Sequence, residues 1–153
     1  MGRIQPQIII IGGPNGSGKS TLANEVMREL NIPYLSADSI AQELNPTHPE
    51  EKRIESGKVF FNRLSRFTDS KQDIIIESTL SGRSLVRHLK DLRALGTYSI
   101  QTIYLFIDNP ELCWKRVQIR DKKGGHIVPK EDVIRRYTGS MINFWYLYRD
   151  LSD

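Results

Sequence analysis

The chain has 153 residues and a mass of 17.6 kDa, enough for one domain with a buried core. Its 39% hydrophobic and 26% charged residues are ordinary for a globular protein. No apolar run approaches the roughly 20 residues of a membrane helix, and no signal-like segment precedes the first strand, so we expect no membrane association. The single cysteine, Cys113, excludes an internal disulfide, and we expect a cytoplasmic protein.

The net charge is +4, from 22 lysines and arginines against 18 acidic residues. A basic excess can indicate nucleic acid, anionic lipid or phosphorylated small molecules as partners. Here the basic residues are dispersed, with short clusters at 120–123 and 135–136 and no interleaved aromatic residues. We therefore expect phosphate ligands rather than a nucleic acid.

Apolar strands alternate with helical stretches, which is typical of an α/β fold with a parallel sheet. The run at 7–11 is apolar without alternation, which predicts a strand covered by helices on both faces. In chain order we expect a strand at 7–11, a helix at 19–30, a strand at 34–38, a helix at 50–67, a strand at 73–77, a helix at 85–95, a strand at 101–107, a helix opening at 109–111, a loop at 121–129 and a helix at 130–148.

A phosphate-binding loop is expected between the first strand and the first helix. Residues 13–20 fit the pattern G-x-x-x-x-G-K-[ST], in which glycines let backbone N–H groups wrap around phosphates. Lys19 is expected to reach the β- and γ-phosphates of ATP or GTP, and the Ser20 hydroxyl to bind Mg²⁺. The predicted nucleotide-binding residues are Gly13, Pro14, Asn15, Gly16, Ser17, Gly18, Lys19, Ser20 and Thr21.

Acidic residues follow the second and third expected strands, at the edge where open parallel sheets bind ligands. Asp38 is expected to orient the acceptor hydroxyl as a catalytic base; the alternative is that it caps the helix that follows. Glu77 could hold a Mg²⁺-bound water or the acceptor, or could be a solvated strand end. Thr79 and Arg83 lie in the next turn, and we assign them with Asp38 and Glu77 to acceptor binding.

Arginines flank the glycine-bearing loop. Arg116 and Arg120 are four residues apart and share one helix face. Because phosphoryl transfer concentrates charge on the equatorial oxygens, we predict both to be catalytic, with a mobile lid at about 120–130 and Arg136 as a further ligand. The alternative for each arginine is a solvated surface position. His126 has no Cys or His at ligand spacing, so we expect no metal role for it.

These motifs together resemble those of the zeta-toxin-like P-loop kinases, over nearly the whole chain and in order. The phosphate loop alone is generic, whereas the motifs after the third strand and in the lid are more specific. The resemblance is carried by residues 13–21, 38–41, 44–46 and 77–82, by Arg116, Val117 and Arg120, and by residues 124–129.

The resemblance implies a three-layer P-loop, nucleotide-kinase-like fold, with a mostly parallel sheet of four to five strands and helices on both faces. Such folds usually carry a fifth strand after the last long helix, and this sequence stops at Asp153. The best-known members phosphorylate UDP-N-acetylglucosamine as toxins held by an antitoxin, which makes an antitoxin a candidate partner. By this resemblance the catalytic aspartate falls on Asp38, the acid and hydroxyl that contact the sugar nucleotide on Glu77 and Thr79, and the lid arginines on Arg116 and Arg120.

We therefore predict a single P-loop kinase domain, residues 1–153, that moves the γ-phosphate of ATP or GTP to a hydroxyl of a small molecule, with a UDP-sugar as a candidate. Two alternatives stay open: a nucleotide-dependent ATPase or switch without an acceptor, and a polynucleotide 5′-hydroxyl kinase. The third strand ends in Glu77 instead of the aspartate usual in ATPase motifs, which counts against the first. The lack of a clustered basic groove counts against the second.

Overall fold

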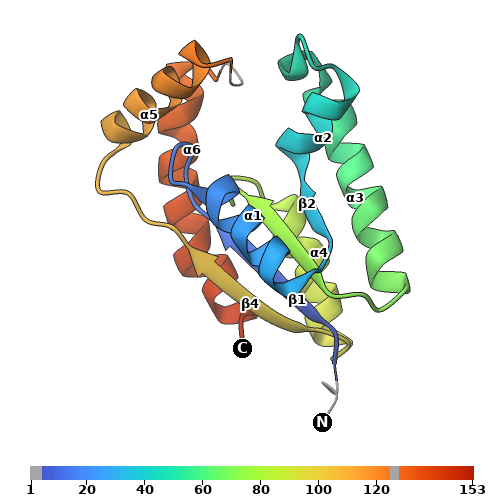
Figure 1. Ribbon diagram of the computed structural model, residues 1–153. Coiled ribbons are helices and arrows are strands. Elements are labelled where there is room, and N and C mark those ends of the chain that lie inside the picture. Colours follow the sequence, from blue (N-terminus) through green and yellow to red (C-terminus); the bar gives the residue numbers. More distant parts are fainter. Residues whose placement is uncertain (1–4, 125–127) are drawn as a thin grey trace.

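The computed structural model describes residues 5–124 and 128–153, and within them the centre is a sheet of four parallel strands in the order β2-β3-β1-β4 (Figure 1). The strands are β1 Gln7–Gly12, β2 Tyr34–Ser36, β3 Ile74–Ser78 and β4 Ser99–Tyr104. The helices are α1 Lys19–Leu30, α2 Ala37–Leu44, α3 Arg53–Asp69, α4 Ser84–Ala94, α5 Pro110–Lys122 and α6 Lys130–Asn143, with shorter turns η1 Pro49–Lys52, η2 Phe144–Tyr148 and η3 Arg149–Leu151.

Helices cover both faces of the sheet, as expected (Figure 1). On one face Ile9 and Ile11 of β1 pack with Ala23 of α1. On the other face Ile8 and Ile10 belong to the core formed with α3, α4 and the C-terminal turns. Successive residues of a strand point to opposite faces, so an unbroken isoleucine run fills both cores at once. The three-layer α/β arrangement is thereby confirmed.

The second strand is shorter than expected, because a helix begins where the prediction continued the strand to residue 38. Ser36 caps α2: its Oγ accepts a hydrogen bond from the Ser39 N–H at 3.4 Å. Ala37 then opens the helix and Asp38 lies in its first turn. The capping role weighed as the alternative for Asp38 therefore belongs to Ser36.

Other boundaries also moved. The fourth strand was expected at 101–107 and is found at Ser99–Tyr104. The last helix was expected to reach residue 148, but its α-helical part ends at Asn143 and a wider π turn continues to Tyr148. The expected loop at 121–129 begins later, since α5 continues through Lys122. Residues 125–127 of that loop, including His126, lie outside the described residues.

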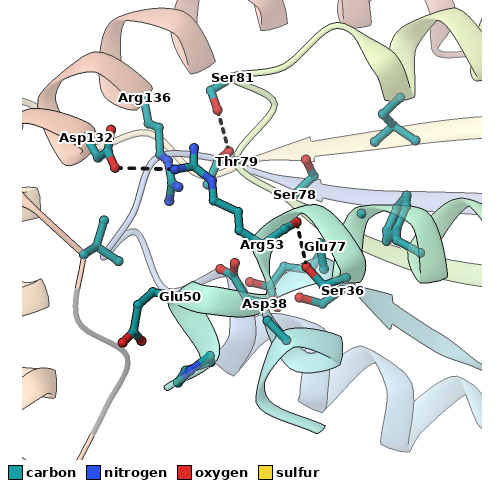
Figure 2. Close-up of a pocket in the computed structure, with 18 of the residues that line it drawn as sticks. Ser36, Asp38, Glu50, Arg53, Glu77, Ser78, Thr79, Ser81, Asp132 and Arg136 are labelled. Carbon is teal, nitrogen blue, oxygen red and sulfur yellow. Dashed lines mark hydrogen bonds and ion pairs between the residues drawn. The ribbon is translucent and has the colours of Figure 1, made fainter. Parts of the chain in front are cut away.

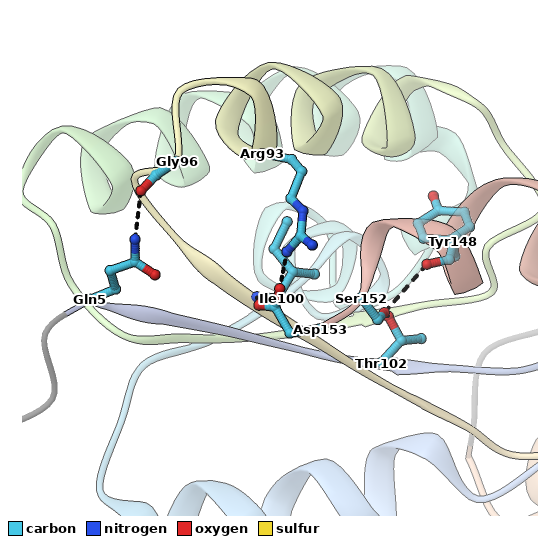
Figure 3. A network of polar contacts seen from close by, with 8 residues as sticks. All are labelled: Gln5, Arg93, Gly96, Ile100, Thr102, Tyr148, Ser152 and Asp153. Atoms are coloured by element: carbon cyan, nitrogen blue, oxygen red, sulfur yellow. Dashed lines mark hydrogen bonds and ion pairs between the residues drawn. The ribbon is translucent and has the colours of Figure 1, made fainter.

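The last residues of the chain lie against the outer edge of β4 (Figure 3). The Asp153 N–H donates to the Ile100 carbonyl at 2.8 Å, and the Ile100 N–H donates to the Asp153 carboxylate at 2.9 Å. Ser152 bonds to the Thr102 hydroxyl at 2.7 Å, and Arg93 pairs with Asp153. In the described part of the chain the sheet has four strands, the lower end of the predicted range.

Among the described residues, no helix is both long and apolar enough to cross a membrane.

Candidate active site

The phosphate loop joins β1 to α1 at the carboxyl edge of the sheet. Gly16 and Gly18 have φ of 76° and 92°, in the left-handed region that favours glycine. A Cβ on Gly16 would also lie 2.9 Å from the Cys113 carbonyl oxygen of α5, so this position has no room for a side chain. Gly18 caps α1, whose N-terminus carries backbone N–H groups without helical partners. This arrangement is suited to bind an anion.

Lys19 is held inside this loop. Its side chain is only 7% exposed, and its ammonium donates to the Pro14 carbonyl at 2.9 Å. Burial lowers the pKa of Lys19, while the nearby carboxylates of Glu77 and Asp38 act in the opposite direction. The buried Ser17 hydroxyl has no hydrogen-bond partner in the described part of the chain. A cradle of glycines with a lysine and a spare hydroxyl fits a nucleotide phosphate.

A cavity of about 740 Å³ opens over this loop. Of the predicted nucleotide-binding residues, those that line it are Asn15, Gly16, Gly18, Lys19, Ser20 and Thr21. Gly13, Pro14 and Ser17 do not line it. Gly13 fits close beneath the loop, where a Cβ would lie 2.6 Å from the Leu105 carbonyl oxygen.

The two predicted lid arginines meet this nucleotide cavity from α5. Arg116 donates to the Gly16 carbonyl at 3.3 Å, so it is already fixed against the phosphate loop. Arg120 also lines the cavity and lies near enough to Lys19 to lower the pKa of the lysine. Both arginines thus lie at the cavity, on the helix that precedes the predicted lid, of which residues 125–127 lie outside the described residues.

Glu77, at the end of β3, is 7% exposed and accepts two hydrogen bonds. The Ser20 hydroxyl donates to Oε1 at 3.1 Å, and the Tyr34 hydroxyl of β2 donates to Oε2. Ser20 is the predicted Mg²⁺ ligand. Of the roles left open for Glu77, this contact favours the one at the metal over that of a solvated strand end.

Tyr34 is a site residue that the sequence analysis missed. It is half-buried, and its hydroxyl fixes the orientation of Glu77 from the neighbouring strand. Burial, followed by the charge of Glu77, raises the pKa of Tyr34 to about 12. The available signal was its alternation with Ser36 and proximity to Asp38, but a lone strand tyrosine is more often a core residue.

We expect Tyr34 to stabilise the fold up to unusually alkaline pH. Its folded-state pKa lies above the unfolded value of about 10, so this contribution is complete below pH about 10 and is lost as the pH rises toward about 12. Urea unfolding of the unaltered protein and of Tyr34→Phe across pH 8–12 measures it. Tyr146→Phe, at an exposed tyrosine, is the control. A stability difference that already disappears below pH 10 would contradict the assignment.

A second cavity, of about 410 Å³, adjoins the first (Figure 2). It lies beyond the ends of β2 and β3, between α3 and α6, and its wall includes Phe60, Phe61 and Leu85. The two cavities share Lys19, Asp38 and Glu77. A phosphate on Lys19 and a molecule in the second cavity would therefore meet at Asp38.

The turn after β3 presents hydroxyls to this second cavity. Thr79 and Ser81 both line it, and their hydroxyls are hydrogen-bonded to each other at 2.8 Å. Between them Leu80 is left-handed, with φ of 59°, a strained conformation for a branched residue. The strain is held by the Asn143 amide, which donates to the Leu80 carbonyl at 2.7 Å, and by packing of the Leu80 side chain on Gly12.

The predicted acceptor residues divide into two groups. Asp38, Glu77, Thr79 and Arg136 line the second cavity. Arg83 is exposed at the start of α4 and lines neither cavity, so the structure does not bring it to the site.

Arg53 is a second residue that the sequence analysis missed. It lines the second cavity from the first turn of α3. Gly57 and Phe60, four and seven residues later in the helix expected at 50–67, line the same cavity, so Arg53 lies on the same helix face. That spacing was the signal.

Curated relatives that resemble the chain in sequence include an uncharacterised protein and a cytidylate kinase. An uncharacterised protein of Haemophilus influenzae is 31% identical over 134 residues, which cover 88% of this chain and 94% of the relative. A cytidylate kinase of Sulfurisphaera tokodaii is 32% identical over 103 residues, which cover 61% of this chain and 57% of that enzyme. The match thus spans little more than half of the kinase.

Solved structures that share the fold include one from an RNA repair complex and one from a toxin–antitoxin system. A chain of the Pnkp1/Rnl/Hen1 RNA repair complex superposes with a TM-score of 0.72 at 23% identity, over 92% of this chain and 46% of that one. A chain of the PezAT toxin–antitoxin system of Streptococcus pneumoniae gives a TM-score of 0.65 at 17% identity, over all of this chain and 68% of that one. At these identities the likeness establishes a P-loop kinase fold.

The family model described as "Zeta toxin" matches residues 1–150. It therefore covers the phosphate loop, both cavities and the C-terminal helices, which is almost the whole chain. The earlier resemblance is confirmed, and this chain belongs to the zeta toxin family.

Proposed function

We propose that this protein is a phosphotransferase that moves the γ-phosphate of ATP or GTP to a hydroxyl of a small molecule. The observation that carries the proposal is the pair of adjoining cavities that share Lys19, Asp38 and Glu77. One shared residue is a cation suited to the transferred phosphate, and the others are carboxylates suited to a hydroxyl or a metal ion. A donor in one cavity and an acceptor in the other would be aligned for direct transfer.

The residues of the two cavities have separate tasks in this proposal. Lys19 neutralises the β- and γ-phosphates, and Asp38, exposed in the first turn of α2, receives or orients the acceptor proton. Arg116 and Arg120 hold the phosphates from α5 and stabilise the charge that develops on the equatorial oxygens. Thr79 and Arg136 hold the acceptor.

Mg²⁺ belongs to this proposal as the ion that would accompany the nucleotide. Ser20 would be its protein ligand, and Glu77, which already accepts the Ser20 hydrogen bond, would orient a metal-bound water. The ion would supply charge neutralisation of the β- and γ-oxygens. Mg²⁺ at nucleotide sites is usually held by one or two protein oxygen ligands together with the phosphates, and a hydroxyl with one carboxylate fits that pattern.

A nucleotide switch or ATPase without an acceptor is the weaker alternative. It would need the first cavity only, whereas the second is walled by aromatic residues and holds the hydroxyls of Thr79 and Ser81. The likeness of this chain to a chain of the RNA repair complex keeps a polynucleotide 5′-hydroxyl kinase as a further alternative. At 23% identity, however, that likeness is one of fold alone. The acceptor of such a kinase remains one arm of the experiment below.

The direct test is transfer from γ-labelled ATP or GTP, with Mg²⁺, to three classes of acceptor: UDP-sugars, nucleosides with their monophosphates, and 5′-hydroxyl oligonucleotides. We expect labelled product from the small molecules, with a UDP-sugar as the first to try. Labelling of the oligonucleotide alone would support the polynucleotide kinase. Release of inorganic phosphate at the same rate with and without every acceptor would reject a phosphotransferase. Co-purification with an antitoxin encoded alongside the protein tests the proposed partner.

We expect Arg120→Ala to lower turnover by about 10²-fold and to change nucleotide affinity much less, because its contact strengthens as charge develops in the transition state. Steady-state kinetics combined with equilibrium binding of an ATP analogue separates the two effects. Lys115→Ala is the matched control, since Lys115 is exposed on the same helix and lines neither cavity. Equal losses of turnover and affinity would make Arg120 a ground-state ligand only.

A further inference from the structure

We infer that Tyr34 is a positioning residue of the nucleotide site: its hydroxyl fixes the carboxylate of Glu77, and through Glu77 it orients the Ser20 hydroxyl that would hold Mg²⁺. This inference deepens the proposed function and rests on it only for the metal at the nucleotide, not for the transfer or the acceptor. Tyr34 lines neither cavity, so it would act through Glu77 and touch neither the metal nor the nucleotide.

The register of the sheet puts Tyr34 on the same face as Glu77. Along β2 and β3, Tyr34 pairs with Ile75 and Ser36 pairs with Glu77, and side chains two residues apart on a strand share a face. On this face Tyr34 packs against the core beneath α1, the helix that carries Ser20. Strand β2 therefore brings Tyr34 to the surface on which Glu77 and Ser20 meet.

The length of the tyrosine side chain explains how β2 reaches Glu77. Ser36 is the direct neighbour of Glu77 in the register, but its hydroxyl oxygen accepts the Ser39 N–H and caps α2. Tyr34 lies two residues earlier, about 6.6 Å along the strand, a distance that a tyrosine side chain spans. Its hydroxyl is the group that donates to Oε2 of Glu77.

Glu77 is thus held from two sides. The Ser20 hydroxyl donates to Oε1 at 3.1 Å, and the Tyr34 hydroxyl donates to Oε2. A hydroxyl has one proton and two lone pairs, so Ser20 can bind a cation through its oxygen while its proton stays on Glu77. Glu77 then sets the direction of the Ser20 lone pairs, and Tyr34 sets the direction of Glu77. Removal of a group that orients a metal ligand usually changes metal affinity or activity by about 10- to 100-fold.

Tyr34 differs in its partner from tyrosines that only support the fold. The hydroxyls of Tyr98 and Tyr137 donate to backbone carbonyls, at distances of 2.9 to 3.3 Å. The Tyr34 hydroxyl donates to a buried carboxylate that lines both cavities. Its ring contributes to the core, whereas its hydroxyl acts on the nucleotide site. A phenylalanine would keep the first contribution and lose the second.

Nucleotide binding with and without the metal tests this role. The affinities for non-hydrolysable analogues of ATP and GTP are measured by calorimetry in Mg²⁺ and in EDTA, and the ratio of the two values is compared between variants. We expect Mg²⁺ to tighten binding to the unaltered protein. Tyr34→Phe should remove most of that gain, about 10-fold, and leave the affinity in EDTA nearly unchanged, which also shows that the phosphate loop is intact.

Tyr98→Phe is the matched control. Tyr98 is buried, donates two hydrogen bonds and lines neither cavity. Its substitution should lower the melting temperature and keep the Mg²⁺ ratio, which separates a loss of stability from a loss of positioning.

A second comparison shows whether Tyr34 acts through Glu77. Glu77→Gln should lower the same ratio, because the orienting carboxylate is lost. Tyr34→Phe added to Glu77→Gln should then lower the ratio no further, since two residues that act as one unit give non-additive effects. Losses that add fully would reject the positioning role and leave Tyr34 as a residue of the core.

The inference is also overturned if Mg²⁺ does not tighten nucleotide binding, if Tyr34→Phe keeps the ratio, or if Tyr98→Phe lowers it equally. Transfer assays on the same preparations keep the two proposals apart. Loss of the Mg²⁺ effect in Tyr34→Phe, without transfer to any acceptor by the unaltered protein, would reject the phosphotransferase and keep the positioning role. Transfer by the unaltered protein, with the full Mg²⁺ effect in Tyr34→Phe, would do the reverse.

Discussion

Lys19→Ala is expected to abolish phosphoryl transfer, with a fall of at least about 10²–10³-fold. Lys19 is the cation that both cavities share, and its ammonium lies within the phosphate loop. Without it, Asp38 and Glu77 would face the incoming phosphates with less compensating charge, which costs more in a buried site than in water. Transfer should therefore fall further than nucleotide binding, to which the backbone of the loop also contributes.

Transfer from γ-labelled ATP and the melting temperature, measured on one preparation, check this result. Lys58→Ala is the control, because Lys58 is exposed on α3 and lines neither cavity. A folded Lys19→Ala variant with near-normal turnover would count decisively against the site.

Asp38→Asn is expected to lower transfer by about 10²–10⁴-fold and to leave nucleotide binding nearly unchanged. The substitution keeps the shape of the side chain and removes its charge, and Asp38 is one of the three residues that line both cavities. Slow hydrolysis of ATP should fall much less, because water can still reach the γ-phosphate. Stability should change little, since Ser36 caps α2 and a carboxylate in the first turn contributes only about 0.3–1 kcal/mol.

Three measurements on one preparation separate the roles of Asp38: the transfer rate, the affinity for a nucleotide analogue with Mg²⁺, and the melting temperature. Asp91→Asn serves as the control, because Asp91 is exposed on α4 and away from both cavities. Unchanged transfer would eliminate Asp38 as the base. Loss of nucleotide binding would instead assign it to the Mg²⁺ shell.

The order of strands and helices and the two-sided covering of the sheet were predictable, because hydrophobic periodicity is a local property of the chain. The residues at which strands and helices begin and end were less predictable. The strand expected to reach residue 38 ends at Ser36, because the Ser36 hydroxyl accepts a hydrogen bond from the Ser39 N–H and caps a helix that begins at Ala37. Four to five strands were expected, and the described part of the chain has four, with Asp153 bonded to Ile100 at the outer edge of β4.

The contacts that orient the candidate site depend on strand neighbours that are distant in sequence. Tyr34 and Glu77 meet because β2 lies next to β3, and Ser20 reaches Glu77 because β1 lies on the other side. No spacing within one segment encodes such a pairing. Arg83 illustrates the reverse error: it follows a motif that lines the cavity, yet the start of α4 carries it to the surface.

The sequence by itself determined the phosphate loop, because the wrapping of glycine N–H groups around a phosphate and the placement of Lys19 and Ser20 are properties of one short segment. Only the tertiary structure decided the second cavity. Its arginines, Arg53 and Arg136, stand on helices that the chain visits far apart, and their charges act on each other only after both helices pack around the end of the sheet. Local pattern therefore predicts the phosphate loop, and long-range packing builds the second cavity.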